Sequence, residues 1–126
     1  MEKKIVVTEN APAAIGPYSQ AVKVGEMVFL SGQIPLDAAT GELIQGGLEA
    51  QTKQVLRNLK AVLEASGSSL EKVVKTNVFI KSMKDFPLVN EIYATFFKED
   101  APARACVEVS ALPKDALVEI EAVAIC

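Results

Sequence analysis

The chain has 126 residues, of which 50% are hydrophobic, and its mean hydropathy is +0.26. This length fits one domain that buries about two-thirds of the surface of the unfolded chain. The net charge of −3 and the pI of about 5.0 disfavour the electrostatic attraction that nucleic-acid binding requires. No apolar run approaches the roughly 18 residues of a membrane span. The apolar excess therefore predicts a homo-oligomer, because an exposed patch of that size promotes aggregation.

Histidine is absent, and the only cysteines are Cys106 and Cys126. Without histidine the chain cannot build a Ser-His-Asp or Cys-His nucleophilic centre, a Cys₂His₂ zinc site or an HExxH metalloprotease site. There is also no glycine-rich phosphate-binding motif. Two cysteines are too few for a disulfide framework, and the N-terminus lacks the apolar segment of a secretory signal. We therefore expect a cytoplasmic protein without a thiolate metal site and without a motif for binding a nucleotide.

The first half of the chain predicts two or three strands and a helix. Residues 5–7 are a short β-branched run, and residues 10–17 form a loop. Residues 19–24 and 27–31 flank a Gly-Glu pair and predict a β-hairpin. After a loop at 32–47, apolar residues recur every three or four positions over 48–66 and predict a helix. Gly67 follows it at the position of a left-handed C-terminal cap.

The second half predicts a strand at 73–80, a helix that starts near residues 85–87, and strands at 104–110 and 117–125. Asp85 is the expected N-cap of the second helix, and Pro87 lies in its first turn. Setting aside the short N-terminal run, the order is strand, strand, helix, strand, helix, strand, strand. This order predicts a single α+β domain over residues 1–126, with two helices on one face of a sheet. The other face would be bare, which again predicts a partner subunit.

Strand periodicity places Arg104 and Cys106 on one face of their strand, and Glu119 and Glu121 on one face of the last strand. A hairpin centred near residues 112–113 would set Cys106 opposite Glu119 and Arg104 opposite Glu121. The guanidinium would then bind a substrate carboxylate, and the glutamate would orient or deprotonate a water. The alternative is a solvated surface ion pair, worth about 0–1 kcal/mol. The thiol lacks a histidine base and is not expected to be a nucleophile.

Further candidates lie on a loop, at a strand end and on the second helix. Tyr18 follows a Gly-Pro pair, and its phenol can donate into a pocket; the alternative is a packing role. Ser31 and Gly32 end a strand, where glycine allows close approach to a ligand or simply makes a turn. Asn90 lies beside the apolar stripe of the second helix, where it is either exposed or at the rim of a pocket.

Several separated stretches carry motifs that run in order along the chain. They are residues 10–20 (NAPAAIGPYSQ), 29–35 (FLSGQIP), 74–79 (VKTNVF), 85–86 with 89–90, and 102–107 (PARACV) with Leu112 and residues 118–120. Together they resemble the RidA/YjgF family, which is also labelled reactive intermediate deaminase or endoribonuclease L-PSP. The resemblance covers essentially the whole chain.

The resemblance implies a chorismate-mutase-like α+β fold in a homotrimer, with the sheets forming a central barrel and the sites between subunits. It also implies that Arg104 binds the substrate carboxylate and that Glu119 positions the attacking water. The pocket would be lined by Tyr18, Ser31, Gly32, Asn90 and Cys106. The implied reaction is hydrolysis of reactive 2-imino acids, formed from 2-aminoacrylate or its homologue, to 2-oxo acids and ammonia. It requires no metal and no organic cofactor.

Three other functions remain open at this stage, and for one of them, a redox-regulated chaperone, the sequence offers no evidence in either direction. A binding module without catalysis would use the same arginine to hold 2-oxo acids, and the presence of Glu119 favours the enzyme. The endoribonuclease or translation-inhibitor label is disfavoured by the acidic pI and by the lack of histidine and of a basic, aromatic stripe.

Overall fold

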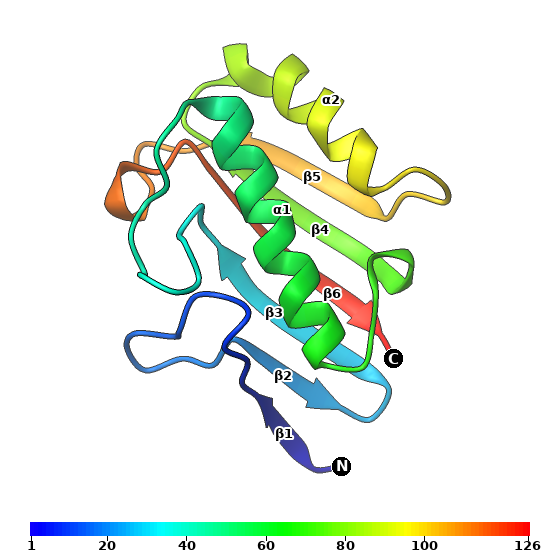
Figure 1. Cartoon of the computed structure of the whole chain (residues 1–126). Helices are drawn as coiled ribbons and strands as arrows, with labels where there is room; N and C mark the ends of the chain where they lie inside the picture. Colours follow the sequence, from blue (N-terminus) through cyan, green and yellow to red (C-terminus); the bar gives the residue numbers. More distant parts are fainter.

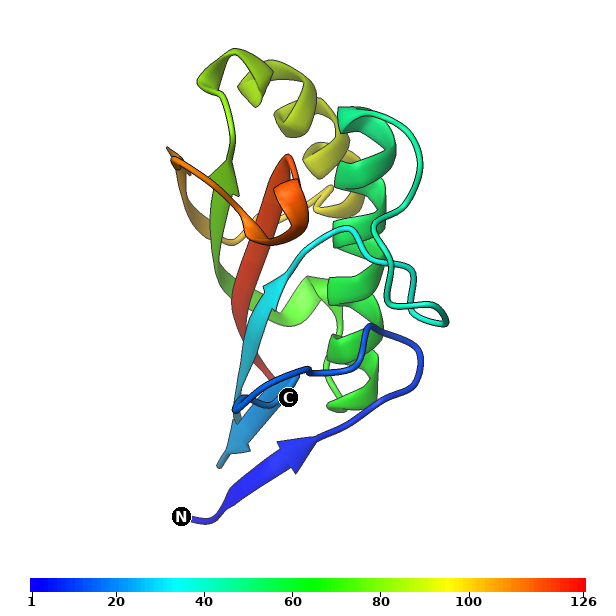
Figure 2. The same ribbon diagram turned by 90° about the vertical axis from the view of Figure 1, so that its left-hand side faces the viewer.

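The computed structural model describes all 126 residues and contains a mixed six-stranded sheet with two α-helices on one face (Figures 1 and 2). The strands are β1 (Lys3–Val6), β2 (Ala21–Val24), β3 (Met27–Gln33), β4 (Val73–Ile80), β5 (Ala103–Glu108) and β6 (Val118–Ile125). The helices are α1 (Leu48–Ala65) and α2 (Phe86–Phe96), and short 3₁₀ turns lie at Leu70–Lys72, Met83–Asp85 and Pro113–Asp115. The predicted α+β domain with one helical face is confirmed.

The strands lie in the order β1-β2-β3-β6-β4-β5, so the C-terminal strand is inserted in the middle of the sheet. All neighbouring strands are antiparallel except β4 and β5, which are parallel. The connection between β4 and β5 is α2, because parallel neighbours require a crossover. Both β1 and β5 are edge strands, and each leaves one side without a hydrogen-bonded neighbour.

The predicted hairpin of the last two strands is wrong, because β4 lies between β5 and β6. Arg104 is aligned with Thr76 of β4, and Thr76 is aligned in turn with Ala122 of β6, on the face that carries the helices. Glu119 is aligned with Phe79 and therefore lies on the opposite face. Glu121 is two residues further along β6 and shares that face. Arg104 therefore cannot form the ion pair or the shared pocket that the hairpin predicted with either glutamate of the same chain. The predicted alternation of side chains between the two faces of each strand is correct. The order of the strands in the sheet was not predictable in the same way, because it depends on packing against α2.

Helix α1 is held by its apolar stripe, as its periodicity predicts. Five of its side chains are fully buried between the helix and the sheet: Val55, Leu56, Leu59, Val62 and Leu63. Gly67, with φ of +83°, takes the left-handed conformation expected at the end of this helix. Asp85 precedes α2 but makes no side-chain capping bond, because it already lies in the 3₁₀ turn before the helix.

The face of the sheet away from the helices, here called the bare face, has no cover within the chain (Figure 2). Ile5, Phe29, Val107 and Ile125 lie on this face and are 42 to 51% exposed. An apolar sheet face of this extent is typical of a surface that another subunit covers. None of the helices combines the length and the hydropathy that a membrane span requires.

Candidate active site

Four of the seven predicted site residues line one cavity of about 450 Å³, here called the carboxylate cavity. Its wall combines the end of the N-terminal loop, the end of β3, the turn before β6, and β6 itself. The lining residues are Tyr18, Ser31, Gly32, Ile34, Pro113, Glu119 and Glu121. Residues from the two ends of the chain meet here because β6 lies directly beside β3.

A β-bulge shapes the floor of this cavity. Leu30 is aligned with Ala122 and Gln33 with Ile120, so β3 has one residue more than β6 over this stretch. The additional residue lies at Ser31 and Gly32. Gly32 belongs to the strand, whereas the sequence predicted that a loop begins there. A bulge changes the direction in which the neighbouring side chains of its strand point, and bulges are frequent beside active sites.

Gly32 leaves room for the carboxylate of Glu119. A Cβ atom at position 32 would lie 2.9 Å from Cδ of Glu119 and would overlap one of its carboxylate oxygens. Gly32 does not have a positive φ, so the space and not the backbone conformation requires glycine here. Gly32 thus accommodates the side chain of Glu119, and its approach to a ligand stays a prediction.

The electrostatic environment of Glu119 favours its protonated form. Burial is the main cause that raises the pKa of this carboxyl above the usual 4.5, and the neighbouring Glu121 raises it further. No hydrogen bond or cation within the chain offsets these effects. Glu121 accepts a hydrogen bond of 3.0 Å from Nδ2 of Asn77 on β4. A half-buried carboxyl with a raised pKa in a cavity is typical of a group that exchanges protons.

The loop that carries Tyr18 is fastened by Gln20, which is 4% exposed. Its Oε1 accepts from the backbone N–H of Thr8, and its Nε2 donates to the carbonyls of Thr8 and Pro12. Oγ of Ser31 donates to the carbonyl of Ser19, which ties the same loop to the bulge. Gln20 was not predicted as a site residue, although it ends the motif at residues 10–20, because its role depends on contacts 8 to 12 residues away.

The other three predicted site residues form a second cluster, here called the arginine cluster, between β5 and α2. Nη1 of Arg104 donates to Oδ1 of Asn90 over 2.7 Å, and the guanidinium lies 4.8 Å from the ring centre of Tyr93 and 5.4 Å from that of Phe86. Arg104 has no carboxylate partner, because the only ion pair in the chain joins two residues of α1. The alternative of a solvated Arg–Glu pair is therefore wrong. Because the guanidinium of Arg104 contacts only a neutral amide and two aromatic rings, its charge is available to an anionic ligand.

Cys106 lies two residues beyond Arg104 on the same face of β5 and packs against the edge of the core. Burial raises the pKa of its thiol above the usual value, and Arg104 lowers it to a smaller extent. This environment disfavours the thiolate and agrees with the expectation that Cys106 is not a nucleophile.

The carboxylate cavity and the arginine cluster are separated within the chain. They lie on opposite faces of the sheet, with β4 between their strands. Arg104 lies on β5, an edge strand, and Glu119 lies on the bare face. One chain therefore carries two halves of the predicted site but does not bring them together.

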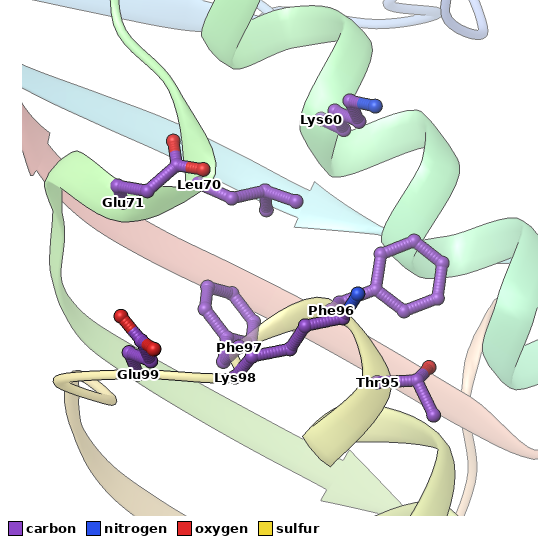
Figure 3. A pocket seen from close by; sticks show the side chains of 8 residues that line it. All are labelled: Lys60, Leu70, Glu71, Thr95, Phe96, Phe97, Lys98 and Glu99. Carbon is purple, nitrogen blue, oxygen red and sulfur yellow. The ribbon is translucent and has the colours of Figure 1, made fainter.

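A further hollow of about 590 Å³ lies between α1 and the end of α2 (Figure 3). It mixes two lysines, two glutamates and apolar side chains, and it contains none of the predicted site residues. Its lining residues are Lys60, Leu70, Glu71, Thr95, Phe96, Phe97, Lys98 and Glu99. Nowhere in the structure are three or more cysteine, aspartate or glutamate side chains arranged to hold a metal ion.

Comparisons with known proteins place these residues in a family. The family model described as endoribonuclease L-PSP matches residues 8–126. A Salmonella typhimurium protein named 2-iminobutanoate/2-iminopropanoate deaminase is 52% identical, with 97% of each chain covered. A crystal structure of a putative endoribonuclease from Thermotoga maritima has a TM-score of 0.96 and 55% identity, covering 100% of this chain and 98% of that one.

A third relative is known with a ligand. The crystal structure of Escherichia coli TdcF with bound serine has a TM-score of 0.92 and 47% identity, and 98% of each chain is covered. Both the sequence matches and the solved structures extend over nearly the whole chain. The chain therefore belongs to the endoribonuclease L-PSP family, the family of RidA and YjgF proteins.

Proposed function

We propose that this protein is a 2-iminobutanoate/2-iminopropanoate deaminase, which hydrolyses 2-imino acids to 2-oxo acids and ammonia in the cytoplasm. The observation that carries the proposal is the unpaired guanidinium of Arg104, which offers its planar fork to a carboxylate. Glu119, a half-buried carboxyl that lines the carboxylate cavity, supplies the second group that the reaction needs. The deaminase name of a relative with 52% identity supports the same reaction.

The two halves of the site meet between subunits in this proposal. Three chains form a ring, with the bare faces turned inward as a central barrel and the helices outside. The half-exposed apolar side chains of the bare face support this arrangement, because association would remove them from water. The edge position of β5 supports it as well, since the arginine cluster lies where a neighbouring chain can reach it.

In the complete site Arg104 binds the carboxylate of the imino acid, and Asn90 keeps the guanidinium in place. Tyr18, Ser31 and Gly32 line the side of the neighbouring subunit, where Glu119 holds the water that attacks C2. Cys106 lines the arginine side. The imine also hydrolyses without an enzyme, so positioning of one water supplies most of the acceleration that is needed. Each tenfold gain corresponds to about 1.4 kcal/mol of barrier.

A binding module for 2-oxo acids is the second candidate, and the serine bound to TdcF supports a pocket for small carboxylates. A ribonuclease function has less support, because the chain carries a net charge of −3 and has no histidine. Cleavage of RNA by the wild type that is lost in Arg104→Ala would restore that function.

A coupled assay tests the proposal. A serine or threonine dehydratase generates the imine, semicarbazide traps it, and this protein competes with the trap. We expect the wild type to reduce the semicarbazone yield and Arg104→Ala to have no effect on it. Arg57→Ala is the matched control, because Arg57 is the only other arginine and is exposed on α1. Equal trapping with and without the wild type would contradict the deaminase and favour the binding module.

A further inference from the structure

Two carboxylates, and not one, line the carboxylate cavity. Glu119 and Glu121 are two residues apart on β6, so both side chains point to the bare face. Neighbouring side chains on the same face of a strand are about 7 Å apart, close enough for their charges to interact. The second carboxylate is not used in the proposed function, and it has a fixed position, because Asn77 directly opposite on β4 donates to its Oε2.

We propose that Glu121, held by Asn77, is a positioning residue whose negative charge keeps a proton on Glu119, so that Glu119 enters the reaction as an acid. This inference rests on the proposed deaminase function. It assigns different tasks to two carboxylates that differ in their surroundings. Glu119 lies beside Gly32 and accepts no hydrogen bond within the chain, whereas Glu121 accepts a hydrogen bond from the side-chain amide of Asn77. Catalytic pairs of carboxylates are commonly divided in this way.

The proton cycle balances with one carboxyl group. The carbonyl oxygen of protonated Glu119 accepts a hydrogen bond from the attacking water, and its O–H donates to the imine nitrogen. As the water oxygen bonds to C2, the C=N electron pair moves to nitrogen, which takes the proton of Glu119, and the water returns a proton to the carboxylate. Glu119 then protonates the amine, the C–N bond breaks, and the hydroxyl proton returns to Glu119 as the C=O bond forms. The products are the 2-oxo acid and ammonia.

The charged groups around Glu119 are few. Tyr18 and Glu121 are the titratable groups that share its cavity, and from the other strands only Gly32, Ser31, Asn77 and Phe79 face it.

The nearest lysines lie outside the cavity. Lys75 lies further along the same face of β4, level with Val123. Lys81 follows β4 and donates to the carbonyl of Ser110, and Lys114 donates to the carbonyl of Gly41. In the proposed assembly the substrate carboxylate binds Arg104 of the neighbouring chain and so neutralises the charge of that guanidinium.

The pH dependence of kcat/KM tests the inference, because the sign of the effect differs between an acid and a base. If Glu119 acts as an acid, activity falls as the pH rises through its pKa. Glu121→Gln removes the neighbouring negative charge, lowers that pKa and moves the falling limb to lower pH. At a pH above the limb, kcat/KM falls about tenfold when the limb moves down by about one pH unit. We expect Asn77→Ala to move the limb in the same direction by less, and Glu64→Gln, an exposed carboxyl on α1, to leave it in place.

An unmoved limb in Glu121→Gln, or a gain of activity at neutral pH, would overturn the inference. Oligomer size and thermal unfolding of each variant show whether it is folded. If Glu121→Gln does not fold, the shift of the limb in Asn77→Ala provides the test. A ¹³C NMR titration of the Glu119 carboxyl in the wild type and in Glu121→Gln measures the same coupling without turnover. If the wild type did not hydrolyse imines, the deaminase proposal would fail, and this titration would still decide whether Glu121 holds the proton on Glu119. An unchanged Glu119 pKa in Glu121→Gln would overturn the inference in either case.

Discussion

Substitution of Gly32 by alanine is expected to displace the Glu119 carboxyl while leaving the fold intact. The new Cβ would lie 2.9 Å from Cδ and 3.2 Å from Cγ of Glu119, whereas carbon atoms in contact prefer about 3.5–4.0 Å. The side chain must therefore retreat by roughly 1 Å. A displacement of that size costs about 10²-fold in rate, or about 2.7 kcal/mol of transition-state stabilisation. The loss of stability should be only about 1 kcal/mol, because the clash involves the end of a flexible side chain.

The dehydratase-coupled assay gives kcat/KM, and thermal unfolding at fixed protein concentration gives the stability. Gly47→Ala is the matched control, since it has negative φ and nothing would lie within 4 Å of its Cβ. We expect this control to keep full activity and to lose at most about 1 kcal/mol, because alanine is a weaker N-cap than glycine. Wild-type activity in Gly32→Ala would refute the argument that the space beside the bulge sets the position of Glu119.

Two further substitutions test how the structure supports the site. Thr76→Val leaves the buried hydroxyl of Tyr93, now bonded at 2.7 Å, without its partner and should cost about 1–3 kcal/mol in urea unfolding. Adding Tyr93→Phe should restore most of that stability, and a double variant no more stable than Thr76→Val would contradict the role of this bond. Asn58→Ala removes the amide that donates to the carbonyls of Ile34 and Leu36, and we expect a loss of about 2–3 kcal/mol. Faster hydrogen exchange over residues 37–44 would accompany it, and an unchanged exchange rate there would count against Asn58 as the anchor of this loop.

The helices and most strands were predictable because their patterns are local. Val55, Leu59 and Val62 recur at helical spacing, and the left-handed conformation at Gly67 follows from its place after the last apolar turn. Bounds at strand ends were less accurate: β3 continues through Ser31 to Gln33, because a bulge lets the strand keep pairing with β6. A bulge leaves no local signal beyond a glycine, so it was interpreted as the start of a loop.

The pairing of the last strands was not predictable from their proximity in sequence. The connection at residues 109–117 has the length of a hairpin loop, yet it crosses β4, because α2 sets β5 parallel to β4 at the edge of the sheet. Asn77 was overlooked for a related reason. It appears as one polar residue in an apolar strand, and its role becomes visible only when β6 aligns it with Glu121.

The sequence by itself determined the class of the fold, the apolar excess that predicts association, and the residue types available for chemistry, since these follow from composition and periodicity. It also identified Arg104 and Glu119 as candidates through the family motifs. Only the tertiary structure decided that these two residues lie on opposite faces of the sheet, in separate clusters. The physical reason is that alternation determines which residues of one strand share a face, whereas the order of strands is decided by long-range packing of α1 and α2 on the sheet.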